Sequence, residues 1–356
     1  SLRDVIDFFN GDRELIPTIV NTREEFFNQH EDYLEDFAEV KGQENIKRAL
    51  EIAAAGGHNV ILIGPPGAGK TMLAKRLPTI LPALTLKEAL ETTKIHSVAG
   101  ILPPGASLIT RRPFRSPHHT ISDVALVGGG TNPRPGEISL AHNGVLFLDE
   151  LPEFKRDALE VMRQPMEERH VTISRAKQTI DYPASLMLVA SMNPCPCGYY
   201  NHPEKDCVCA AGVVKKYLNK ISGPLLDRID IHVEVTPVSY DKLTDYEHTN
   251  ETSAEIRIRV EQARQVQEER FKELKDIYSN AQMPGKMVRE VCALTPAGIN
   301  LLKAAMNKMQ LSARAYDRIL KVSRTIADLE GSPDIKIEHL AEAIHFRSLD
   351  RQAWAG

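Results

Sequence analysis

A glycine-rich segment between an apolar run and a helical run constrains this chain more than any other feature. Residues 61–71 read ILIGPPGAGKT, which contains the phosphate-binding pattern G-x-x-x-x-G-K-[ST]. Its glycines let backbone N–H groups turn inward at a helix N-terminus, where they can surround phosphate oxygens. We therefore expect a strand, a phosphate loop and a helix that stops at Leu77, before Pro78. The expected nucleotide-binding residues are Gly64, Pro65, Pro66, Gly67, Ala68, Gly69, Lys70 and Thr71.

Two residues of this loop and two later carboxylates predict a site for ATP and Mg²⁺. We expect Lys70 to reach the β- and γ-phosphates and Thr71 to ligate Mg²⁺. Residues 144–150, GVLFLDE, read as an apolar strand that ends in two acids. Asp149 suits holding Mg²⁺ through water, and Glu150 suits polarising the attacking water. The alternatives are a glycine turn with an unrelated lysine and an ordinary strand-to-loop cap.

The arrangement of apolar runs predicts an α/β fold followed by helices. Runs at 60–63, 145–148, 186–189 and 231–235 are β-rich and alternate with helical segments. Such alternation indicates a parallel sheet between helices, and continuous apolar runs fit strands buried on both faces. We expect three parts: an N-terminal linker and helix (1–35), an α/β core (36–237) and an all-helical lid (238–356).

Helix-start signals fill the predicted lid. Thr252 and Glu255 form a capping-box pattern that opens a long charged helix through about Lys275. Thr295 followed by Pro296 indicates a second helix start, because proline suits the first helical position. Two further helices are expected near 312–330 and 337–347.

Six segments together resemble an AAA+ module of the magnesium-chelatase-like ATPases of the ComM/YifB type. They are 64–71, 149–150, 191–193, 114–119 (FRSPHH), 135–144 (PGEISLAHNG) and 223–230 (GPLLDRID). The resemblance covers about residues 36–350. It implies a ring-forming ATPase involved in DNA recombination during transformation. Proteins of this type usually also carry an N-terminal Lon-protease-like domain that this sequence lacks, so we expect it to be a fragment.

The resemblance implies three further residues of the ATPase site. Asn193 takes the place of the family's first sensor and would orient the hydrolytic water. Arg228 takes the place of the arginine finger, which reaches the γ-phosphate of a neighbouring subunit, and Arg314 that of the second sensor on a lid helix. The alternatives are a turn residue for Asn193, a salt bridge of Arg228 with Asp227 or Asp230, and a solvated helix face for Arg314.

Global charge gives no indication of a nucleic-acid partner, since the net charge is −4 and the pI about 6.3. Local charge does, because two basic insertions interrupt the core near 101–135 and 168–184. The second has strand-like halves around Ser174–Lys177 and reads as a hairpin with a basic tip. Arg175 and Lys177 would then grip DNA phosphates without reading sequence. A solvated turn is the alternative.

Two C-x-C pairs follow the predicted sensor segment. Cys195, Cys197, Cys207 and Cys209 offer four thiolates, which is the ligand set of a tetrahedral zinc site. The usual C-x-x-C spacing is absent, so free reduced thiols stay open, as do redox or iron–sulfur chemistry.

These patterns together predict an ATP-hydrolysing motor that acts on DNA, as a helicase or branch-migration enzyme, in a hexameric ring. A protein-remodelling ATPase like the magnesium chelatase motor subunit is the alternative. With no apolar run of 18 residues and no signal peptide in the acidic N-terminus, we expect a cytoplasmic protein without membrane contact.

Overall fold

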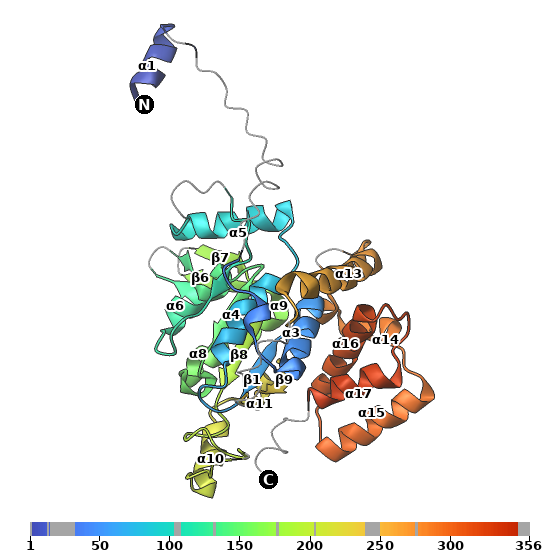
Figure 1. Ribbon diagram of the computed structural model, residues 1–356. Helices are drawn as coiled ribbons and strands as arrows, with labels where there is room; N and C mark the ends of the chain where they lie inside the picture. Colours follow the sequence, from blue (N-terminus) through green and yellow to red (C-terminus); the bar gives the residue numbers. More distant parts are fainter. Residues whose placement is uncertain are drawn as a thin grey trace. The chain divides into compact units, whose positions relative to one another are not determined.

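The computed structural model describes residues 2–12, 14, 33–102, 108–130, 133–175, 178–202, 204–238, 250–274 and 277–347. Its contacts divide the chain into two units, residues 1–32 and 33–356. The first unit contains helix α1 (Leu2–Asn10). The second contains the sheet, its helices and the C-terminal helical region (Figure 1).

A five-stranded, all-parallel sheet forms the centre of the second unit, as predicted. Its strand order is β2-β5-β8-β1-β9. Every residue of β1, β5 and β8 is buried, which explains their continuous apolar sequences. The carboxyl ends of parallel strands lie at one edge, so the segments after these three strands meet there. The strands are β1 (Val60–Ile63), β2 (Phe114–Arg115), β5 (Val145–Leu148), β8 (Met187–Met192) and β9 (Ile231–Glu234).

The helix after the phosphate loop corrects one prediction. Helix α4 (Lys70–Ile80) continues through Pro78 instead of ending at Leu77. Pro78 lacks only its own N–H, and it lies within the last turn, where few further backbone bonds depend on it. The Thr79 hydroxyl donates to the carbonyl of Arg76 at 2.7 Å and satisfies one acceptor of that turn.

The other helices of this part range from single turns to the 14 residues of α5. Thr85 begins α5 with a capping box, in which Glu88 returns the hydrogen bond. These elements are η1 (Phe37–Glu39), α3 (Glu44–Gly56), α5 (Leu86–Ala99), η2 (Leu151–Glu153), α8 (Arg156–Val161), α9 (Arg163–Glu168), α10 (Ala211–Leu218) and α11 (Gly223–Leu226).

The first predicted insertion folds onto the core through its arginines. Arg112 donates to the carbonyls of Pro82 (2.6 Å) and Asn143 (2.8 Å). Arg115 forms a two-pronged ion pair with Glu137, at 2.6 and 2.7 Å. Both guanidinium groups therefore serve packing within the chain. The segment contains α6 (Asp123–Val127), β3 (Gly128–Gly129) and β4 (Arg134–Pro135), and α7 (Glu137–Leu140) follows it.

The second insertion is an antiparallel hairpin of β6 (His170–Arg175) and β7 (Gln178–Pro183). Its register pairs Arg175 with Gln178 at the tip end and His170 with Pro183 at the base. Val171 and Ile173 are buried and join the core that packs around β5 and β8. Lys177 lies outside the described residues, and Arg175 is described only as the end of β6.

The C-terminal region is helical, as predicted. Helix α13 begins with the Thr252 capping box but ends at Phe271, a few residues before the expected Lys275. Thr295 caps α15 with Pro296 at the first position. Figure 1 shows α14–α17 gathered in one helical group, coloured orange to red. The elements are α13 (Ser253–Phe271), η3 (Asn280–Gln282), α14 (Gly285–Val291), α15 (Pro296–Met309), α16 (Ala313–Leu329) and α17 (Ile337–His345).

A buried polar network joins this helical region to the sheet. Asp230, just before β9, accepts from the backbone N–H of Asn59 at 2.9 Å and lies 2.9 Å from a guanidinium nitrogen of Arg318 in α16. Burial alone would raise the pKa of Asp230, but Arg318, His58 and the Asn59 amide hold it well below its usual value. His58 contacts Thr325 of α16 at 2.8 Å. The carboxylate is therefore charged and paired on both sides of the junction.

Candidate nucleotide site

The phosphate loop has the backbone that its glycines predict. Gly67 and Gly69 have φ values of 78° and 86°, in the left-handed region that glycine adopts without strain. Lys70 is the first residue of α4, so the loop ends at a helix N-terminus. Gln43 donates to the carbonyl of Ala68 at 3.0 Å and fixes the outer side of the loop. The arrangement fits an anionic ligand at the start of α4.

The Lys70 ammonium lies at the centre of the site. Its Nζ donates to the carbonyls of Gly64 (2.7 Å) and Pro65 (2.9 Å) and to Oδ1 of Asn193 (3.0 Å). The residue is only 9% exposed. Burial lowers the pKa of Lys70, while Asp149 and Glu150 oppose that shift. A phosphate would supply the negative charge that this buried cation otherwise lacks at close range.

Asp149 links the loop to two strands. Its Oδ2 accepts from the Thr71 hydroxyl at 2.8 Å, and its Oδ1 accepts a short hydrogen bond from the Ser191 hydroxyl of β8. A carboxylate beside a hydroxyl provides the hard oxygen ligands that Mg²⁺ prefers. Asp149 and Thr71 thus fit the predicted Mg²⁺ site, whereas the bond from Ser191 was not foreseen by the sequence patterns.

Glu150 points toward accessible space next to the same strand end. Its side chain is 57% exposed, and its φ is 54°. The nearest titratable partner is His119, whose Nδ1 lies 3.6 Å from a Glu150 carboxylate oxygen. His119 belongs to the segment 114–119 that carried part of the family resemblance, yet no role had been assigned to it. The imidazole lies where it can orient this carboxylate.

Asn193 directly follows β8, which lies between β5 and β1 in the sheet. Its amide oxygen accepts from Lys70, so the residue faces the phosphate site. The strand order explains this position, because the end of the middle strand must lie between the phosphate loop and the Asp149–Glu150 pair.

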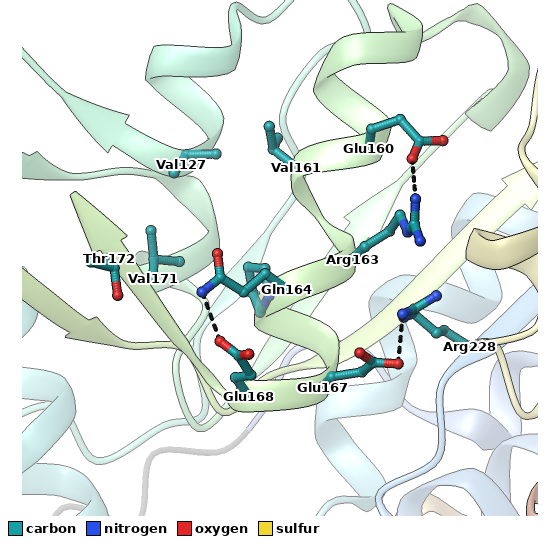
Figure 2. Close-up of a pocket in the computed structure, with 11 residues that line it drawn as sticks. Val127, Glu160, Val161, Arg163, Gln164, Glu167, Glu168, Val171, Thr172 and Arg228 are labelled. Atoms are coloured by element: carbon teal, nitrogen blue, oxygen red, sulfur yellow. Dashed lines mark hydrogen bonds and ion pairs between the residues drawn. The ribbon is translucent and has the colours of Figure 1, made fainter. Parts of the chain in front are cut away.

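Arg228 and Arg314 lie in different surroundings. The guanidinium of Arg228 is 5% exposed, 2.6 Å from Glu167 and 2.6 Å from the carbonyl of Pro224. Figure 2 shows this pair beside a pocket of about 480 Å³ that Gln164 and Thr172 also line. Its ion-pair partner is thus neither Asp227 nor Asp230. Arg314 lies exposed in the first turn of α16.

Among the described helices, none combines the length and apolar character that a membrane crossing requires.

Comparison with known proteins adds two family matches and several relatives. The family "Magnesium chelatase, subunit ChlI" matches residues 36–243, and the C-terminal family of the same subunit matches 250–347. Competence protein ComM of Haemophilus influenzae is 45% identical over 99% of this chain and 67% of its own length. YifB of Escherichia coli is 46% identical over 89% of this chain and 61% of its own. A magnesium-chelatase 38 kDa subunit of Rhodobacter capsulatus is 25% identical over 44% of this chain and 50% of its own. The chain therefore spans about three fifths to two thirds of the first two relatives.

Proposed function

The chain belongs to the magnesium chelatase subunit ChlI family of AAA+ ATPases, and from this premise we propose that it hydrolyses ATP to drive a ring motor on DNA. The observation that supports ATP hydrolysis is that four side chains meet at one edge of the sheet: Lys70, Asn193, Thr71 and Asp149. These side chains come from three separate stretches of the sequence, and each has the chemistry that phosphoryl transfer needs.

Each residue of the site has its own proposed role in ATP hydrolysis. Lys70 binds the β- and γ-phosphates, and Thr71 and Asp149 hold Mg²⁺, which neutralises developing charge on the phosphate oxygens when bound. Glu150 accepts a hydrogen bond from the attacking water, and Asn193 fixes that water's position. The water oxygen forms a bond to the γ-phosphorus while the bond to the β–γ bridging oxygen breaks. The water proton leaves toward Glu150, and the products are ADP and inorganic phosphate.

We further propose that Arg228 and Arg314 complete the site in an oligomer. Arg228 would leave Glu167 and pair with the γ-phosphate held by a neighbouring copy, as an arginine finger does. Glu167 is itself 44% exposed in the isolated chain, so the pair lies where a second copy can displace it. Arg314 would reach the nucleotide from the lid. A hexameric ring is the assembly we propose.

DNA is the proposed client because of the hairpin β6–β7. Arg112 and Arg115 of the first insertion are engaged with carbonyls and Glu137. In the second insertion, the candidates we propose are Arg175, the last residue of β6, and Lys177, two positions later in the sequence. Six copies would bring about twelve positive charges to a ring pore, enough for salt-dependent, sequence-independent binding. The relative named competence protein ComM is consistent with a DNA client.

The test is the double variant Arg175→Ala/Lys177→Ala, measured for DNA affinity across a salt series and for ATP hydrolysis with and without DNA. We expect weaker DNA binding, a flatter salt dependence and lost DNA stimulation, with basal hydrolysis retained. A matched control removes two exposed cations of α15 in Lys303→Ala/Lys308→Ala. Equal DNA binding by both double variants at every salt concentration would contradict the DNA proposal and favour protein remodelling.

A further inference from the structure

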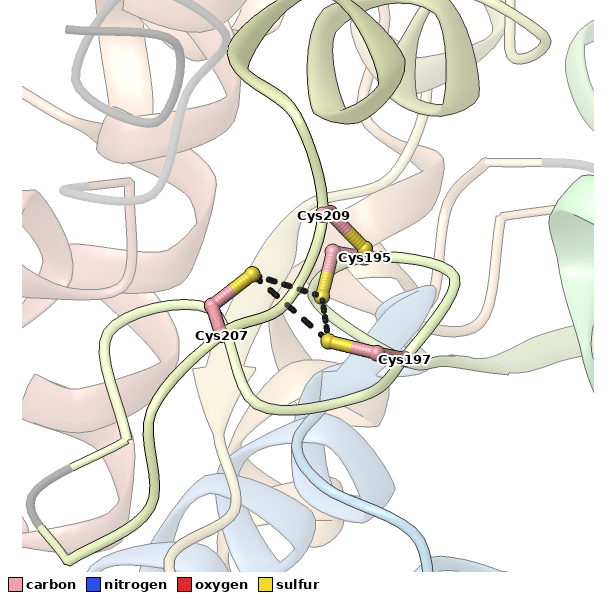
Figure 3. Close-up of side chains that lie close together, drawn as sticks. All are labelled: Cys195, Cys197, Cys207 and Cys209. Atoms are coloured by element: carbon pink, nitrogen blue, oxygen red, sulfur yellow. Dashed lines mark hydrogen bonds between the residues drawn. The ribbon is translucent and has the colours of Figure 1, made fainter.

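Four cysteine sulfurs gather at a single point beside the nucleotide site (Figure 3). The Sγ atom of Cys195 lies 3.3 Å from that of Cys197 and 3.7 Å from that of Cys207, and Cys197 and Cys207 are 3.6 Å apart. All four sulfurs, including that of Cys209, lie within 4.8 Å of one another. These spacings are much longer than a disulfide of about 2.05 Å.

The spacings match one tetrahedral metal ion. With Zn–S bonds of about 2.3 Å, the edge of a regular S₄ tetrahedron is about 3.8 Å. An iron–sulfur cluster distributes its cysteines over several iron atoms and needs sulfurs farther apart. The backbones of Tyr199 and Val208 lie near the Cys197 sulfur. Four soft thiolates at this spacing select zinc over hard cations.

The cysteine segment forms one wall of the nucleotide site. Cys195 is fully buried and lies two residues after Asn193, whose amide oxygen holds Lys70. Farther along, Gly198 touches the phosphate loop so closely that a Cβ there would lie 2.5 Å from Cδ of Pro66. The loop therefore cannot move toward the segment unless the segment gives way.

The other end of the segment returns to the same asparagine. Helix α10 begins at Ala211, two residues after Cys209. Its Tyr217 is 7% exposed; burial raises the pKa of its hydroxyl, and the nearby backbone of Asn193 opposes that rise. From Asn193, the segment thus runs through the four cysteines, contacts Pro66 of the phosphate loop at Gly198, and returns to Asn193 at Tyr217.

We propose that Cys195, Cys197, Cys207 and Cys209 bind one Zn²⁺, and that this ion holds Asn193 and the phosphate loop in the geometry that binds nucleotide. The second half rests on the nucleotide site proposed above, and the first half stands without it. None of the four cysteines forms a disulfide, so a shared metal ion would be what joins the two C-x-C pairs.

The experiment compares the wild type with Cys207→Ser and with Cys292→Ser, a control that removes a buried thiol of the helical region. Metal analysis should give about one zinc per chain for the wild type and for Cys292→Ser, and clearly less for Cys207→Ser. Fluorescent ATP titrated in the presence of Mg²⁺ should bind Cys207→Ser about tenfold more weakly. Melting curves show whether each variant is folded.

A second measurement uses only the wild-type protein, so it does not depend on the variant folding. A thiol reagent such as p-hydroxymercuribenzoate releases zinc from thiolates, and the released ion is counted with a metallochromic dye. Release should proceed with a loss of nucleotide affinity that added thiol and Zn²⁺ restore. Protein that neither contains zinc nor takes it up would overturn the proposal. Bound zinc whose removal leaves nucleotide affinity unchanged would overturn its coupling to the site, and full zinc with no nucleotide binding would instead count against the proposed ATPase.

Discussion

The contact between Gly198 and Pro66 permits a sharp test with a single methyl group. Gly198 has a φ of 85°, so Gly198→Ala forces an alanine into the left-handed region, at a cost of about 1 kcal/mol. The new Cβ would also lie 2.5 Å from Cδ of Pro66, about 1 Å closer than an ordinary contact. Overpacking of this size costs about 1–3 kcal/mol when neighbours must move.

Part of that strain can be relieved if the phosphate loop moves away from the cysteine segment. ATP binding requires the phosphate loop in its original position. The strain energy that was relieved when the loop moved must therefore be supplied again when ATP binds. If about 1.4 kcal/mol is relieved in this way, the dissociation constant for ATP rises about tenfold. The variant should therefore bind ATP weakly even though no nucleotide-contacting side chain has changed.

Equilibrium dialysis with labelled ATP measures this directly, and Gly212→Ala is the matched control. Gly212 lies in α10, and a Cβ there meets no atom within 4 Å. Alanine in a helix is favoured over glycine by up to about 1 kcal/mol, so the control should be no less stable than the wild type. Equal ATP affinity of the two variants would refute the mechanical link between the segment and the loop.

Three further predictions address chemistry, assembly and pH. Lys70→Ala should abolish most ATP binding, whereas Glu150→Gln should bind ATP and hydrolyse it at least about a hundredfold more slowly. If Glu150→Gln hydrolysed ATP at the wild-type rate, the carboxylate would not have the role proposed for it. Specific ATPase activity should rise with protein concentration, and Arg228→Ala should stay inactive at every concentration; full activity in a monomer at high dilution would show that no neighbour is needed. Burial, reinforced by Arg318, lowers the pKa of Lys321 to about 8. The folded protein therefore binds fewer protons than the unfolded chain between about pH 8 and 10.5. The free energy of unfolding should rise with pH across that window. Lys321→Met should therefore be more stable than the wild type at pH 7 by up to about 3 kcal/mol, and denaturant titrations should show that difference shrinking toward pH 10.5; a pH-independent difference would contradict the shift.

The nucleotide site was predictable because its chemistry lies next to strand ends. A buried parallel strand appears in the sequence as an apolar run. The residues that follow such a strand lie at the edge of the sheet formed by the carboxyl ends of its strands. The phosphate-loop pattern predicted Lys70 and the acidic strand end predicted Asp149, whereas Asn193 was implied by the family resemblance. Their hydrogen bonds follow from strand order, which alternation of elements alone does not determine.

Pairings across long sequence distances were not predictable. For Arg228, the alternative to an arginine finger was an ion pair with Asp227 or Asp230, but its ion-pair partner in the single chain is Glu167 of α9. Arg112 and Arg115 belong to the first basic insertion, and the sequence does not show that Glu137 and two carbonyls lie beside them. Pro78 was read as a helix stop, although one missing N–H in a last turn does not end a helix that is packed against its neighbours.

The three oxygens around Lys70 would compete with a phosphate for its ammonium group. An ammonium has three donors, and the carbonyls of Gly64 and Pro65 and the amide of Asn193 occupy all of them. An incoming γ-phosphate must therefore displace at least one of these acceptors. If the displaced group is Asn193, its amide becomes available to a water molecule only after the phosphate has arrived. On the proposed role of Asn193, hydrolysis would then depend on the arrival of the γ-phosphate, because until then its amide stays engaged with Lys70.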